Sequence, residues 1–254
     1  MPGPAVDREV GRPPRVALAV MAKVPIAGEV KTRLCPPLTP VEAAALARCF
    51  IQDRVEQLAA LPVGDPLVAF APHDRAAELR ALVPVNVRLL RQVGDDLGAR
   101  LDHLLTSLLG EGYVGAIAVD ADSPTLPSPY LEAACYRLLG GAADVVLGPS
   151  DDGGYYLIGL RRPASFLFQQ MAWSTPSVLA ETVSRARAAG LRLEMLPPWF
   201  DVDRGPDLER LLQPAPPEAF QPRRTLALLA DWIGRGPARP APRRRGVPEG
   251  FPRC

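Results

Sequence analysis

The sequence has few residues of the kinds that build zinc sites or disulfide frameworks. It holds only two histidines, His73 and His103, and four cysteines that lie far apart without a C-x-x-C pair. Neither histidine has a partner His or Cys at ligand spacing, so both are expected to be structural or surface residues. The cysteine pattern indicates neither a zinc site nor a disulfide framework, and a reducing cytoplasm is the expected compartment.

Long apolar runs and a strong charge of one sign are also missing. No run approaches the roughly 18 apolar residues of a membrane-spanning helix, and we expect no signal peptide before Val16. The 29 Lys and Arg residues balance 28 Asp and Glu residues, which leaves a net charge of +1. This balance gives no field that would attract nucleic acid or a membrane surface, so neither is an expected partner. It does not indicate an oligomeric state.

Proline is in excess, with 30 among 254 residues, and many prolines lie at the two ends. Residues 1–14 and 236–254 combine Pro, Gly and charge without apolar periodicity, so we expect disordered tails there. The chain is long enough for one large α/β domain or two small ones with a sizeable core, and we expect a single transferase domain over residues 15–235. Short apolar runs alternate with helical patterns over this range, which predicts a three-layer α/β domain with a mostly parallel sheet.

The central motif of the chain is an apolar run that ends in two carboxylates. Gly115–Val119 leads directly into Asp120, Ala121 and Asp122, which predicts a strand buried on both faces. Open α/β sheets bind ligands at the carboxyl ends of their strands. Residues i and i+2 of an extended chain point to the same side, so both aspartates can face one cation, Mg²⁺ or Mn²⁺, beside a substrate's phosphates. The alternative is an acidic loop that caps the next helix.

A basic loop, residues 22–34, follows the first predicted strand, Arg15–Met21. It contains Lys23, Lys31 and Arg33 together with the flexible Gly28. Backbone and cationic groups at the carboxyl end of a strand are well placed to hold phosphates. The glycine spacing is not that of a Walker A loop, and the alternative is a solvated surface loop.

The third predicted strand, Val87–Leu90, is followed by a segment with two glycines and two aspartates. Asp95 or Asp96 can cap the next helix. The two glycines on either side of this cap, Gly94 and Gly98, indicate a close approach of the backbone, either to a ligand or to a neighbouring strand. If the approach is to a ligand, Gly94 and Asp96 contribute to nucleotide binding.

Two more acidic segments follow predicted strands. The acidic turn, Pro149–Tyr156, contains Asp151 and Asp152, and it is either a hairpin-like turn or one wall of an acceptor pocket. Farther along, Asp201 and Asp203 form a second D-x-D pair after a strand. Two such pairs at two strand ends could supply opposite sides of one metal site.

Six segments occur in this order: AKVPIAGEVKTRL, GDDLGARL, VDADSPTL, LGPSDDGGYYLIGL, WST and FDVDRGPDL. Together they resemble the DUF2064 group, described as radical-SAM/selenodomain-associated transferase 1. That group belongs to the GT-A, or nucleotide-diphospho-sugar transferase, superfamily and is similar to 2-phospho-lactate guanylyltransferases. The resemblance covers about Val16 to Leu211. The sequence departs from the expected pattern in the central motif, which has Ala121 before Asp122 where Ser-Asp-Cys or a similar triplet is expected.

This resemblance implies a three-layer GT-A fold with a nucleotide-binding N-terminal half and an acceptor-binding C-terminal half, bridged by a divalent cation. It implies that Asp122 is the leading metal ligand, with Asp120 beside it and Asp203 or Asp201 opposite. It further implies that the three cations of the basic loop hold phosphates and that the acidic turn shapes the acceptor site.

Three hypotheses fit these residues: two transfer reactions and a protein without catalytic activity. In nucleotidyl transfer, a phosphorylated small-molecule acceptor attacks the α-phosphorus of a nucleoside triphosphate and releases pyrophosphate. It needs no protein nucleophile, and the basic loop suits the charge of a triphosphate. In glycosyl transfer from a nucleotide sugar to an arsenosugar-type or other small acceptor, an inverting enzyme needs a carboxylate base, which Asp151 or Asp152 could supply. The third hypothesis is an inactive nucleotide-binding protein.

Overall fold

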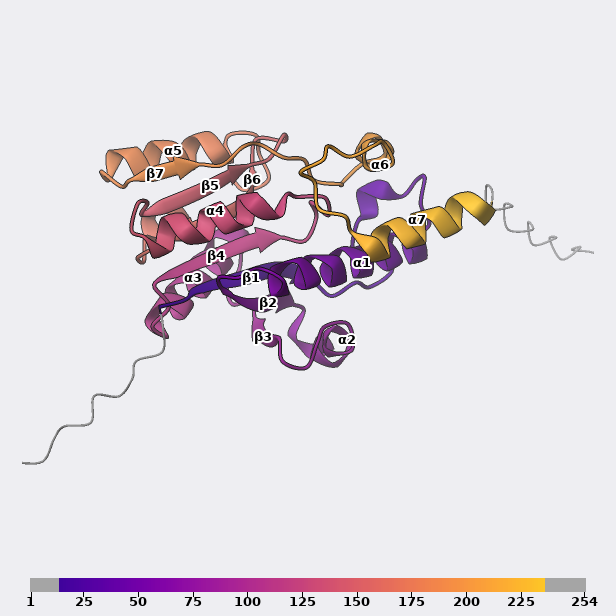
Figure 1. Ribbon diagram of the computed structural model, residues 1–254, viewed down its shortest axis with the longest axis horizontal. Coiled ribbons are helices and arrows are strands. Elements are labelled where there is room, and N and C mark those ends of the chain that lie inside the picture. The colour runs from indigo at the N-terminus through magenta and orange to yellow at the C-terminus, as the bar shows by residue number, and fades with distance from the viewer. Residues whose placement is uncertain (1–13, 236–254) are drawn as a thin grey trace, which may run out of the picture.

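The computed structural model describes residues 14–235 and shows a central sheet between layers of helices (Figure 1). The predicted tails lie outside the described residues, except for Pro14. The seven strands follow the order β3-β2-β1-β4-β6-β5-β7. Their bounds are β1 (Val16–Lys23), β2 (Asp65–Ala71), β3 (Arg88–Arg91), β4 (Gly115–Asp120), β5 (Val145–Pro149), β6 (Tyr155–Leu160) and β7 (Leu193–Met195). Among the strands of residues 14–235, only β6 runs antiparallel to its neighbours, so the predicted mostly parallel α/β sheet is confirmed.

The helices alternate with the strands as the sequence predicts. Their bounds are α1 (Pro40–Ala59), α2 (Ala76–Arg80), α3 (Leu97–Gly110), α4 (Ser128–Leu139), α5 (Val178–Ala188), α6 (Gly205–Leu211) and α7 (Arg223–Arg235), with short 3₁₀ turns η1 (Thr32–Leu34), η2 (His73–Arg75) and η3 (Ser165–Leu167). No helix in this described part of the chain is both long enough and apolar enough to cross a membrane.

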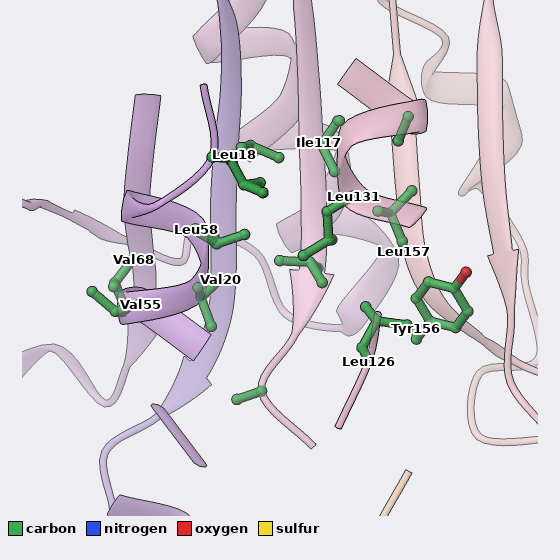
Figure 2. Packing of buried hydrophobic residues seen from close by; sticks show 14 of the residues in the cluster. Leu18, Val20, Val55, Leu58, Val68, Ile117, Leu126, Leu131, Tyr156 and Leu157 are labelled. Atoms are coloured by element: carbon green, nitrogen blue, oxygen red, sulfur yellow. The ribbon is translucent and has the colours of Figure 1, made fainter. Parts of the chain in front are cut away.

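Side-chain alternation along the strands divides the core between the two faces of the sheet. In β1, Leu18 and Val20 pack with α1 and α4, whereas Ala17 and Ala19 pack with α3 and α5. Figure 2 shows the first of these layers, in which Leu58 of α1 lies against β1. Because both faces are covered, every position in the middle of the strand is apolar.

Local signals in the sequence fix where the long helix α1 begins. Thr39 accepts a hydrogen bond from the backbone of Glu42, and the Glu42 carboxylate accepts one from the Thr39 backbone, which is a capping box with Pro40 in the first turn. Such a cap contributes about 1 kcal/mol. At the other end of the chain α7 packs along α1 (Figure 1), where the Asp53 carboxylate accepts hydrogen bonds from the Arg224 and Thr225 backbones.

A separate apolar cluster lies at the carboxyl end of the sheet. Leu34 of η1, Phe50 of α1 and Val202 are buried in it together with residues of α6 and α7. It fixes the basic loop against the segment around Val202, although the two are about 170 positions apart in the sequence. This packing brings Lys31 to Asp203.

The acidic turn is a hairpin connection, as one of the two sequence hypotheses predicts. It joins β5 to the antiparallel β6, and Gly153 adopts a positive φ of 88° within it. A Cβ atom on Gly153 would lie 2.4 Å from the backbone oxygen of Pro176. The close approach at this glycine is therefore to the protein's own backbone.

We expect Gly148→Ala to destabilise the fold by about 1–3 kcal/mol, because the core is overpacked there. An added Cβ atom would lie 2.3 Å from the ring of Tyr156, whose hydroxyl donates a hydrogen bond to the backbone oxygen of Pro197. Denaturant unfolding measures the change. Gly110→Ala is the matched control, because nothing lies within 4 Å of its added methyl group and alanine favours the helix by up to about 1 kcal/mol. Equal stability of Gly148→Ala and the wild type would contradict this packing.

Candidate active site

A cavity of about 650 Å³ lies where the basic loop meets the carboxyl ends of β1 and β4. Its charged lining residues are Lys23, Glu29, Lys31, Arg33, Arg100, Asp120, Asp122 and Asp203. The cavity thus combines four cations with four carboxylates at the edge of the sheet where open α/β folds bind ligands.

Lys31 joins the two D-x-D segments. Its Nζ atom lies 2.9 Å from Oδ1 of Asp122 and 2.7 Å from Oδ1 of Asp203, and it donates to the backbone oxygen of Val202 at 2.8 Å. An ammonium group has three hydrogens, so all of them are used by these acceptors. The two segments also touch directly, because the Val202 backbone N–H donates to the Asp122 carbonyl at 2.8 Å.

The Lys31 side chain is almost wholly buried, with 5% exposed. Burial lowers the pKa of its ammonium, but the charges of Asp122 and Asp203 and the hydrogen bonds to both outweigh that effect and hold the pKa above its ordinary value. The Nζ atom also lies 5.6 Å from the ring centre of Phe50, a cation–π contact. The ammonium is therefore charged and enclosed on several sides.

Two residues of the cavity hold unusual backbone conformations. Lys31 has a φ of 49° and Ser174 a φ of 64°, in the left-handed region that non-glycine residues rarely adopt. Each such residue costs about 1–3 kcal/mol, and strain of this kind clusters at functional sites.

Asp120 and Asp122 line the same cavity but have different partners. The alternation expected to align them stops at Asp120, because β4 ends there. Asp120 Oδ2 accepts a hydrogen bond from Ser123 Oγ at 2.7 Å, and its Oδ1 is buried without a hydrogen-bond partner, 3.7 Å from the Arg54 guanidinium. Burial raises the pKa of Asp120 to about 7, against the opposing effect of the Arg54 charge.

Arg54 lies beneath this loop and is wholly buried. Its guanidinium donates to the Ser123 carbonyl at 2.5 Å and to the side chain of Gln57. The Gln57 amide in turn donates to the Leu126 carbonyl at 2.6 Å. Helix α1 therefore holds the loop after β4 from inside the core.

The remaining predicted carboxylates bond to protein groups outside this cavity. Asp201 accepts from Ser150 Oγ at 3.2 Å, and burial, with the charges of Asp203 and Asp152, raises its pKa to about 6. Asp151 pairs with Arg210 at 2.7 Å. Asp152 accepts from the Gly154 backbone N–H at 2.9 Å, within its own turn.

The donor set fits a divalent cation only in part. Within residues 14–235, no group of three or more His, Cys, Asp or Glu side chains is arranged to hold a metal ion. Asp122 and Asp203 nevertheless direct one oxygen each at a single position, which the Lys31 ammonium occupies. Two carboxylates at one point suit Mg²⁺ or Mn²⁺, which take further oxygens from phosphates and water.

The residues predicted for nucleotide binding lie in three different places: in the cavity lining, in the basic loop and at the start of α3. Lys23 and Arg33 line the cavity. Gly28 has a φ of 86° and open space where a Cβ atom would lie. Gly94 packs against the first turn of α3, and Asp96 caps that helix by accepting from Ala99 N at 2.7 Å.

The sequence analysis did not predict four residues that line the cavity or hold its loops in place. Gln92, Arg100 and Ser174 line the cavity, and Arg54 supports the loop after β4. Arg100 lies one helical turn after the Asp96 cap, so the phase of the helix could have placed it near the strand ends. Arg54 left no such signal, because it lies within a long amphipathic helix far from the central motif.

Comparison with known proteins places this fold in a family. The family model described as "Uncharacterized protein conserved in bacteria (DUF2064)" matches residues 54–175. The crystal structure of a protein from Desulfovibrio desulfuricans G20, assigned as a nucleotide-diphospho-sugar transferase, is similar at 32% identity and a TM-score of 0.80, over 87% of this chain and 96% of that one. No curated protein matches the chain.

Two more distant structures have a similar fold. CMP:2-keto-3-deoxy-manno-octonic acid synthetase, complexed with CTP, has a TM-score of 0.50 at 15% identity, over 86% of this chain and 99% of that one. 4-diphosphocytidyl-2C-methyl-D-erythritol synthase has a TM-score of 0.50 at 14% identity, over 78% and 97%. The match to the DUF2064 model, together with the identity and coverage of the Desulfovibrio protein, shows that this chain belongs to the DUF2064 family and has the nucleotide-diphospho-sugar transferase fold.

Proposed function

We propose that residues 15–235 form a divalent-metal-dependent transferase that moves a nucleotidyl group from a nucleoside triphosphate to a small phosphorylated acceptor. The observation that carries this proposal is the cavity that combines the position shared by Asp122 and Asp203, held by Lys31, with three further cations in its lining, Lys23, Arg33 and Arg100. Once a divalent cation balances Asp122 and Asp203, the cationic side chains of the lining would be available to the charges of a triphosphate. The resemblance to an assigned nucleotide-diphospho-sugar transferase supports a nucleotide donor.

The chemistry requires positioning and charge stabilisation more than a protein nucleophile. An oxygen of the acceptor phosphate attacks the α-phosphorus, and the bond from that phosphorus to the departing pyrophosphate breaks. Lys23, Arg33 and Arg100 are proposed to hold the triphosphate. Asp122 and Asp203 would hold Mg²⁺ or Mn²⁺, which neutralises phosphate charge when bound.

Lys31 has to change partners in this proposal. All three of its ammonium hydrogens are bound to protein oxygens, so it has none left for a phosphate. We propose that it leaves Asp122 and Asp203 when metal and nucleotide bind together, and that its ammonium then contacts phosphate. Asp120 and Asp201 are proposed to flank the metal position as outer carboxylates.

Glycosyl transfer from a nucleotide sugar is the second candidate. The name assigned to the Desulfovibrio protein favours it. An inverting mechanism needs a free carboxylate base, but Asp151 is paired with Arg210 and Asp152 stabilises its own turn. We therefore rank it second, with the acidic turn as the proposed acceptor wall in both reactions.

A substrate screen distinguishes the two reactions and the inactive alternative. The protein is incubated with nucleoside triphosphates or nucleotide sugars, phosphorylated and neutral acceptors, and Mg²⁺ or Mn²⁺. Pyrophosphate and free nucleoside diphosphate are followed separately. Acceptor-dependent pyrophosphate release supports nucleotidyl transfer, and diphosphate release from a nucleotide sugar supports glycosyl transfer. Binding without either product indicates an inactive nucleotide-binding protein.

Asp122→Asn and Asp203→Asn should each abolish metal-dependent turnover, because both carboxylates are proposed to bind the same ion. The double variant should then lose little more activity than either single variant. Turnover measured against Mg²⁺ and Mn²⁺ concentration tests this. Full activity of Asp203→Asn, or strictly multiplicative losses in the double variant, would contradict a shared ion.

Arg33→Ala should weaken nucleotide binding by about 1.5–3 kcal/mol, the range of a charge-assisted contact. Arg33 is exposed and lines the cavity, so its removal should leave the fold unchanged. Isothermal titration calorimetry measures the change. Arg187→Ala is the matched control, because Arg187 is also an exposed arginine and lies on α5, outside the lining of this cavity. Unchanged affinity in Arg33→Ala would remove this residue from the phosphate site.

A further inference from the structure

Another cavity, of about 520 Å³, lies at the edge of the sheet opposite the candidate active site, and we call it the arginine pocket. It is lined by Val114, Asp144, Arg161, Arg162 and Arg192. Val114, Asp144 and Arg192 directly precede β4, β5 and β7. Arg161 and Arg162 follow β6, which runs antiparallel to β4 and β5, so the end of β6 lies at the starts of its neighbours. The arginine pocket therefore lies away from the carboxyl ends of the parallel strands, where the candidate active site is.

Backbone hydrogen bonds hold these strand ends together. The Arg161 N–H donates to the Asp144 carbonyl at 3.0 Å, and the Asp144 N–H donates to the Arg192 carbonyl at 2.8 Å. Strands β6, β5 and β7 are adjacent in the sheet (Figure 1). The reversal of β6 thus brings its two arginines to the same place as the arginine that begins β7.

One carboxylate, that of the buried Asp144, lies among the three guanidinium groups. Arg192 binds both of its oxygens, with Nη2 at 2.9 Å from Oδ1 and Nε at 3.0 Å from Oδ2. These hydrogen bonds lower the pKa of Asp144 to about 2, so this group is ionised at neutral pH. Arg162 lies farther away, at 3.6 Å from Oδ2. Arg192 is therefore the partner that compensates the Asp144 charge.

The Arg161 guanidinium has no hydrogen bond or ion pair with any residue in the range 14–235. It lies against Gly141, since a Cβ atom there would be 3.1 Å from Cζ of Arg161. The Gly141 carbonyl also accepts a hydrogen bond from Arg192 at 2.5 Å. Two guanidinium groups therefore lie at one glycine, where their like charges repel. With three arginines and one carboxylate, the lining has two positive charges more than it has negative charges.

We propose that the arginine pocket is a second anion site, which binds the phosphate group of a small phosphorylated molecule or free phosphate. A phosphate monoester carries a charge of about −1.5 to −2 at neutral pH, which matches the two arginines that Asp144 does not compensate. Guanidinium groups bind phosphate oxygens through paired N–H donors. The volume is within the range of small-molecule sites, roughly 300–1,000 Å³, so the rest of a phosphorylated molecule has room.

This inference goes beyond the proposed transferase reaction. No residue that lines the arginine pocket also lines the cavity around Asp122 and Asp203. A ligand in the arginine pocket would therefore bind alongside a donor nucleotide instead of competing with it.

A nuclear magnetic resonance titration of the full chain locates the binding. Inorganic phosphate and phenyl phosphate are added at pH 7, and the backbone amide signals of the five lining residues are followed. Both ligands should shift these signals in a saturable way, and the monoanion benzoate should bind at least about tenfold more weakly than phenyl phosphate. Tighter binding of phenyl phosphate than of phosphate would indicate a phosphorylated small molecule as the ligand, and equal affinities would indicate free phosphate. Signals that do not move, or benzoate that binds as tightly as phenyl phosphate, would overturn the proposal.

The double variant Arg161→Gln/Arg162→Gln tests which side chains bind the phosphate. It should weaken binding about tenfold or more, as measured from the signals of Asp144 and Arg192. Both replaced side chains are exposed, and Arg192 still holds Asp144, so the fold should be kept. Arg161→Gln alone should weaken binding at least about threefold, and it decides the question if the double variant does not fold. Affinity equal to wild type in these variants would contradict the proposed site.

Two further variants serve as controls. Arg187→Gln replaces an exposed arginine on α5 outside the lining, and it should leave phosphate affinity within about twofold of wild type. Arg33→Ala changes the candidate active site and should also leave the signals of the arginine pocket within about twofold. If Arg33→Ala removes the shifts and the double variant does not, the phosphate lies in the candidate active site and the second anion site is overturned.

Discussion

The repulsion between Asp122 and Asp203 is the constraint on which the site depends. Two carboxylates that direct oxygens at one position are unstable unless a cation lies between them. In this chain the cation is Lys31, whose Nζ atom lies within 3 Å of an oxygen of each. The left-handed backbone of Lys31 and the apolar cluster around Phe50 and Val202 serve to place that ammonium. The structure therefore places the Lys31 ammonium at the position where a divalent cation is proposed to bind.

This arrangement gives one group two proposed roles. While Lys31 neutralises the carboxylates, the fold can form without metal and without net repulsion at the sheet edge. The same ammonium is proposed to contact phosphate once metal and nucleotide bind together, so that the two ligands favour each other's binding. Arg54 supports the site from the opposite side, because it fixes the Ser123 carbonyl through helix α1 without lining the cavity.

Much of this fold follows from local patterns, whereas the inner contacts of the site do not. The run that ends at Asp120 predicted a buried central strand, and Thr39 with Pro40 predicted the start of α1. The matching positions of Asp122 and Asp203 after two strands predicted their proximity. The sequence could not show that Lys31 lies between them, because its backbone conformation and the packing around Phe50 are tertiary features. Nor could alternation show that Asp120 turns toward Arg54, since the strand geometry stops at that residue.

The affinity of the free protein for Mg²⁺ or Mn²⁺ tests the central claim most directly. Lys31→Met removes the competing ammonium, so this variant should bind the bare ion at least about tenfold more tightly than wild type in calorimetry without nucleotide. Lys31→Arg keeps the charge and should bind the ion as weakly as wild type. Equal or weaker ion binding by Lys31→Met would show that the ammonium and the metal do not share a position, and would contradict this account.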